Sequence, residues 1–129
     1  MVVPRYQSSH TNMSGLEKDE IIGVSIAGLQ QLLELVQASS PQPSWTTAVV
    51  CEKIVKPKTL ARQCSYAELL ADTTPEVLGR ATVFISHPWR GNFQELVEIC
   101  SETYTDVDFL WFDLIVNSQH GNNDRPFVW

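Results

Sequence analysis

The sequence lacks the features of a membrane protein or a secreted protein. No uninterrupted apolar run approaches the roughly 18–20 residues that a membrane-spanning helix needs. Residues 1–7 do not show the basic and then apolar layout of a secretory signal. The three cysteines, Cys51, Cys64 and Cys100, are odd in number and form no CxxC pair, which argues against a disulfide framework or a zinc site. We therefore expect a cytoplasmic protein without a membrane segment, whose cysteines are buried thiols.

Basic residues are scarce in the second part of the chain. The 129 residues include 9 Lys and Arg against 15 Asp and Glu, a formal net charge of −6. Residues 81–129 contain only Arg90 and Arg125 against seven acidic residues, a net charge of −5. Nucleic-acid binding generally requires a basic surface that replaces the counterions of the phosphates. We therefore expect no nucleic-acid partner.

Several catalytic and binding motifs are also missing. The glycines form neither a GxGxxG pattern nor a P-loop, so no phosphate-binding loop is indicated. Ser86 and His87 are neighbours in a predicted strand, where successive side chains point to opposite faces, and no GxSxG motif is present. His87, Asp113 and His120 lack the i, i+4 spacing of a recognisable metal site, so we predict no bound metal.

The first eighty residues have helical periodicity and form the predicted lead-in. Apolar residues at i, i+3, i+4 and i+7 form one face of a predicted helix, namely Leu29, Leu32, Leu33 and Val36. Ser25 is a suitable N-cap for this helix. We expect a flexible tail over residues 1–24 and an all-helical lead-in over residues 25–80. Residues 39–44 contain two prolines and are expected to end the first helix.

Two further helices are predicted in the lead-in. Thr46 is a suitable cap for a short helix that runs through Ile54 and should end at Pro57. The next helix should begin at Ser65, where Ser65 and Glu68 match a capping box.

The pattern changes at residue 81, where a βαβ unit is predicted. Residues 81–87 are β-branched and aromatic, and residues 108–116 are an almost continuous apolar run, as in strands that are covered on both faces. Between them, helical spacing is shown by Phe93, Leu96, Val97 and Cys100. We expect an α/β fold whose residues 81–129 are the incomplete start of a domain, because two strands are too few for a stable parallel sheet.

Polar residues follow both predicted strands. In an open parallel sheet, ligands bind beyond the carboxyl ends of the strands. The candidate ligand-binding residues at this edge are Ser86, His87, Trp89, Arg90, Asp113, Asn117, Gln119 and His120. A second interpretation is that His87 only caps its strand and bonds to loop carbonyls.

The order of these motifs resembles the start of a Toll/interleukin-1 receptor (TIR) domain. The segments that carry the resemblance are Phe84-Ile85-Ser86-His87-Pro88-Trp89, Phe109-Leu110-Trp111-Phe112-Asp113 and Asn117-Ser118-Gln119-His120. They are similar to a TIR-like group of algae, oomycetes and other protists, in which patterns such as FVSHAW and FWFDIF.NNQH recur. The helical lead-in is also similar, so the resemblance covers roughly residues 45–125.

The resemblance implies a flavodoxin-like domain of about five parallel strands. Residues 86–90 would be the loop after its first strand, and residues 114–125 the loop after its second strand, which in the family contributes to assembly and gates the nucleotide site. It implies two activities: self-association through TIR-like surfaces in signalling, and cleavage of the nicotinamide–ribose bond of NAD as a substrate. No residue here matches the family's catalytic Glu, since Glu95, Glu98 and Glu102 are better explained as the solvated face of a helix. We expect this chain to be inactive on NAD by itself, with NAD hydrolysis as a candidate activity of the longer protein that the resemblance implies, and we assign no catalytic residues. The alternative is an unrelated α/β small-molecule or nucleotide-binding enzyme that uses His87 and Asp113.

Overall fold

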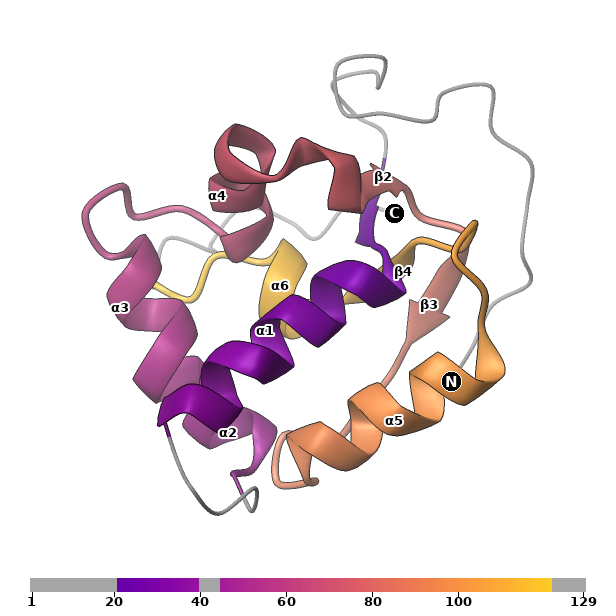
Figure 1. The fold of residues 1–129 in the computed structure, drawn as a ribbon. Helices are drawn as coiled ribbons and strands as arrows, with labels where there is room; N and C mark the ends of the chain where they lie inside the picture. Colours follow the sequence, from indigo (N-terminus) through magenta and orange to yellow (C-terminus); the bar gives the residue numbers. More distant parts are fainter. Residues whose placement is uncertain (1–20, 40–44, 122–129) are drawn as a thin grey trace.

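The computed structural model describes residues 21–39 and 45–121. The chain is an α/β protein with a four-stranded mixed sheet in the order β2-β1-β4-β3 (Figure 1). The strands are β1 (Ile22–Val24), β2 (Leu78–Arg80), β3 (Val83–Ile85) and β4 (Leu110–Phe112). Most of the predicted tail, residues 1–20, lies outside the described residues.

The predicted βαβ unit is present. β3 and β4 are neighbouring parallel strands, with Val83 opposite Leu110 and Ile85 opposite Phe112. They are joined by α5 (Phe93–Thr103). Asn92 caps α5, because its side-chain oxygen accepts from the backbone N–H of Glu95 at 2.9 Å.

The second strand of this unit is shorter than predicted. The expectation of a strand over residues 108–116 is wrong after Phe112, since Asp113 begins the short helix α6 (Asp113–Val116). Leu114 and Ile115 are fully buried in this helix. A short apolar run fits a buried helix as well as a buried strand, so its composition alone does not distinguish them.

The expectation of an all-helical lead-in over residues 25–80 is wrong at its C-terminal end, where β2 forms, and the expectation of a flexible tail over residues 1–24 is wrong at Ile22–Val24, which form β1. β1 pairs with β2 and with β4, antiparallel in both cases, so that β1 and β2 belong to the same sheet as β3 and β4. β1 and β2 each have three residues, too few to show a period. Gly79 allows close packing here, because a Cβ on it would lie 2.7 Å from the ring of Phe109.

One face of the sheet forms the main core. Its residues, in register across the four strands, are Val24, Leu78, Leu110, Val83, Ile85 and Phe112, all buried. They share one cluster with apolar residues of α1 (Ile26–Ser39) and α5, which lie in front of the sheet in Figure 1. Ser25 caps α1 as predicted, since its hydroxyl accepts from the N–H of Gly28 at 3.2 Å.

Residues 47–59 form one continuous helix of three parts, α2 (Thr47–Val50), the π-helical turn η2 (Cys51–Val55) and α3 (Lys56–Thr59). Thr46 caps it as predicted, but Pro57 does not end it. In η2 the N–H of Lys56 donates to the carbonyl of Cys51, five residues back. This wider turn lets the helix continue through a proline, which has no N–H to donate.

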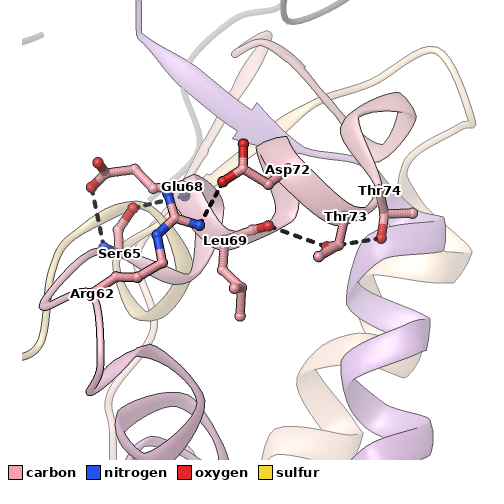
Figure 2. A network of polar contacts seen from close by, with 7 residues as sticks. All are labelled: Arg62, Ser65, Glu68, Leu69, Asp72, Thr73 and Thr74. Carbon is pink, nitrogen blue, oxygen red and sulfur yellow. Dashed lines mark hydrogen bonds and ion pairs between the residues drawn. The ribbon is translucent and has the colours of Figure 1, made fainter.

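The predicted capping box at Ser65 is confirmed (Figure 2). The Ser65 hydroxyl accepts from the N–H of Glu68 at 3.0 Å, and the Glu68 carboxylate accepts from the N–H of Ser65 at 3.2 Å. The helix that follows is α4 (Tyr66–Thr73), whose Asp72 forms an ion pair with Arg62 at 2.6 Å. A 3-10 turn, η3 (Pro75–Val77), then leads into β2.

Within residues 21–39 and 45–121, no helix combines the length and the apolar character that crossing a membrane requires.

Candidate functional site

The helix of residues 47–59 lies against the loops that follow β3 and β4. The N–H of Thr47 donates to the carbonyl of Gly91 at 3.0 Å, and the N–H of Ala48 donates to the carbonyl of Trp89 at 2.9 Å. The carboxyl edge of the parallel pair, where we expect ligands to bind, is therefore joined to the lead-in.

His87 is bound to this helix directly. Its Nε2 lies 2.9 Å from the Thr47 hydroxyl, and its ring meets the Phe112 ring edge-on with centroids 6.0 Å apart. Burial lowers the pKa of His87 below its ordinary value of 6.5, so the imidazole is neutral at pH 7. Gly91 leaves room for the ring, because a Cβ there would lie 2.8 Å from Cε1 of His87.

His120 makes a similar contact at the other end of the same helix. Its Nε2 lies 2.6 Å from the Thr59 hydroxyl, which also donates to the carbonyl of Val55 at 2.7 Å. A hydroxyl has one hydrogen, and in Thr59 that hydrogen is directed to Val55. His120 must therefore carry a hydrogen on Nε2 and act as the donor.

Asp113, Asn117 and Gln119 form a separate polar group at the end of β4. The Asn117 amide donates to the Asp113 carboxylate. The Gln119 amide donates to the backbone carbonyls of Asp113 at 3.3 Å and of Asn117 at 3.0 Å. These bonds hold the turn that follows α6.

Cys51 lies close enough to Asp113 for the carboxylate to affect the ionisation of the thiol. Burial is the main cause that raises the pKa of the Cys51 thiol; the Lys56 ammonium lowers it, and the carboxylates of Glu52 and Asp113 raise it. The thiol is therefore protonated at neutral pH and is not an activated nucleophile.

The remaining candidates do not join this group. Ser86 and Arg90 are exposed. Trp89 is half-buried and packs against the core cluster. The structure directs the side chains of His87 and His120 to the helix of residues 47–59, and those of Asn117 and Gln119 to the α6 turn.

Thr47 and Thr59, which hold the two histidines, were not predicted. Both are fully buried, although their neighbours on the same helical face are apolar, among them Val50, Cys51 and Val55. A polar side chain on an apolar helical stripe needs a buried partner. That pattern is the signal in the sequence from which the two contacts could have been inferred.

The side-chain contacts that the structure shows at this edge are hydrogen bonds and the ring contact of His87 with Phe112. In the part of the chain that the structure describes, no three His, Cys, Asp or Glu side chains gather as metal ligands would. The three cysteines are buried free thiols, as predicted.

Comparison of the chain with protein-family models, curated proteins and solved structures finds no match.

Proposed function

We propose that this chain is a signalling and assembly module of the TIR-like type, which acts in the cytoplasm by associating with other protein molecules. The βαβ unit would then be the start of a flavodoxin-like domain. The order of the motifs in residues 84–120 supports the proposal, together with the parallel pairing of β3 and β4 and the connecting helix α5.

The observation that carries the proposal is the way the carboxyl edge of β3 and β4 is joined to the lead-in. The side chains of His87 and His120 are bonded to the fully buried hydroxyls of Thr47 and Thr59. An edge whose histidines bind the protein's own helix favours a structural joint over a substrate site. In this proposal the lead-in is part of the module that associates.

Cleavage of NAD has no place in the proposal for this chain. That reaction needs a carboxylate that stabilises the positive charge developing on the ribose. Glu95, Glu98 and Glu102 are all exposed on α5, on the side opposite its buried residues. None of them matches the catalytic glutamate of the TIR-like family.

Two measurements on the same preparation test the proposal. The chain is incubated with NAD while nicotinamide release is followed by chromatography, and its sedimentation coefficient is measured at increasing protein concentration. We expect no nicotinamide and a sedimentation coefficient that rises with concentration. Steady nicotinamide release from a chain that stays monomeric would contradict the proposal and favour the enzyme that uses His87 and Asp113.

A further inference from the structure

One face of α5 is acidic and exposed. Glu95, Glu98, Ile99 and Glu102 have the i, i+3, i+4, i+7 spacing of a single helical face, and all four are exposed. The opposite face carries the buried residues Phe93, Leu96, Val97 and Cys100. We call the four exposed residues the acidic face.

In the described part of the chain, the two helices of this layer carry no positive charge. Neither α5 nor the neighbouring α1 contains a lysine or an arginine. Ile99 is 60% exposed within the acidic face, and Val107, just beyond the end of α5, is 67% exposed. Among the described residues no ion pair involves these glutamates, so the acidic face combines negative charge with an apolar side chain that solvent reaches.

The opposite combination occurs on the helix of residues 47–59 and the turn after it. Lys53 and Lys58 are exposed, and Leu60 is 58% exposed. Among the described residues neither lysine has a carboxylate partner, whereas the nearby Lys56 is paired with Glu52 at 3.0 Å. We call Lys53, Lys58 and Leu60 the basic segment.

The two surfaces are carried by different helices. In Figure 1, α3, which carries Lys58, and α5 are on opposite sides of α1. Two acidic faces would repel each other, so a symmetric pair built on α5 alone is unfavourable. Within the described residues no ion pair joins the surfaces of opposite charge in one copy, so each is available to meet its complement on another copy.

We propose that the basic segment of one copy of this chain docks on the acidic face of the next copy, in a head-to-tail arrangement. Lys53 and Lys58 approach the glutamates of α5, and Leu60 covers Ile99. The large apolar side chains that are exposed in the described part of the chain, Leu60, Ile99 and Val107, lie on or next to these two surfaces. A heterologous contact of this kind continues from copy to copy unless its rotation closes a ring. This inference rests on the assembly role proposed above and specifies its partner and its surfaces.

Sedimentation velocity at low and high salt tests the contact. In the wild-type chain, association at low salt should weaken at about 1 M salt, because the Debye length falls from about 10 Å at 0.1 M to about 3 Å. Glu98→Lys should weaken association about tenfold, since an attraction across the contact becomes a repulsion. Glu76→Lys is the matched control, because Glu76 is exposed on η3 and lies outside both surfaces; it should leave association unchanged.

A charge exchange gives the sharper test. The variant Lys53→Glu/Lys58→Glu has two acidic surfaces, and the variant Glu98→Lys/Glu102→Lys has two basic ones. Each should remain monomeric alone, and an equimolar mixture of the two should associate. Circular dichroism of each variant checks that it is folded.

The outcomes separate this inference from the assembly role. Association that resists salt and both double variants would overturn the head-to-tail contact while the assembly role stands. A wild-type chain that stays monomeric up to about 1 mM at low salt would overturn both. Two folded monomeric variants that do not associate when mixed would also overturn the contact.

Discussion

Replacement of His87 by alanine should destabilise the fold, because this side chain joins the β3 loop to the lead-in. The substitution leaves the fully buried Thr47 hydroxyl without its partner at 2.9 Å. A buried hydroxyl without a hydrogen bond costs about 1–3 kcal/mol. The lost ring contact with Phe112 adds about 0.5–1 kcal/mol. We therefore expect the free energy of unfolding to fall by about 2–3 kcal/mol.

Urea unfolding followed by circular dichroism measures this change. The midpoint should fall with an unchanged m-value, and the melting temperature should fall by about 4 °C for each kcal/mol. Ser86→Ala is the neighbouring control, since Ser86 is exposed and should change the free energy of unfolding by less than about 0.5 kcal/mol.

A double-mutant cycle with Thr47→Val separates the hydrogen bond from the packing. If the two side chains stabilise the fold through their contact, the cycle should give a coupling free energy of about 1 kcal/mol. A coupling near zero, or a His87→Ala variant as stable as the wild type, would refute the view that this contact joins the lead-in to the sheet. The strand edge would then be free for the ligand-binding role that the sequence also allows.

Three further predictions follow from the burial of single groups. Burial lowers the pKa of folded His87 below 6.5, so the unfolded chain binds more protons than the folded chain as the pH falls below that value. The stability that this group contributes is therefore present above about pH 6.5 and is lost as the pH falls. The urea midpoint of His87→Ala should depend less on pH in that range than the midpoint of the wild type. Burial raises the pKa of Cys100 to about 11, so a disulfide reagent at about pH 8 should label Cys100 only after denaturation, and rapid labelling of the folded chain, detected by mass spectrometry, would contradict its burial. Gly79→Ala places a Cβ 2.7 Å from the Phe109 ring and should lower the free energy of unfolding by about 1–3 kcal/mol, measured by urea unfolding. Adding Phe109→Leu in the same chain should recover part of this stability. Equal stability of Gly79→Ala and wild type would contradict the close packing at Gly79.

The elements that the sequence predicts well are those with local signals. Ser25, Thr46 and Ser65 each cap a helix as expected, because capping depends on bonds to backbone groups three residues away. The parallel pair β3 and β4 was also expected, since strands covered on both faces are continuous in their apolar character.

The elements that were missed depend on distant residues. β1 and β2 are three residues long, and their pairing through Gly23 and Gly79 is determined by their position in the sheet rather than by a local pattern. Pro57 was expected to end a helix, but η2 changes the hydrogen-bond pattern before it. A π-helical turn has no signal in the local sequence that the expectation could use.

The contacts of His87 and His120 in the candidate site could not be predicted from the sequence, and ligand binding there stays a prediction. Their partners Thr47 and Thr59 are 40 and 61 residues away in the chain, and such contacts appear only once the lead-in is folded against the sheet.

The π-helical turn η2 also sets the phase between the two ends of its helix. Thr47 and Thr59 are twelve residues apart, and in a regular α-helix of 3.6 residues per turn their side chains would point about 120° apart. The one extra residue that a π turn holds reduces the effective spacing to eleven, and eleven residues make three turns to within about 20°. Both hydroxyls therefore face the same direction, one toward His87 and the other toward His120. Deletion of one residue between Cys51 and Val55 could restore a regular α-helix and keep the two hydroxyls in phase. It would also bring Thr59 one residue closer to Thr47. The number of residues in the π turn therefore determines the distance between the two histidine contacts.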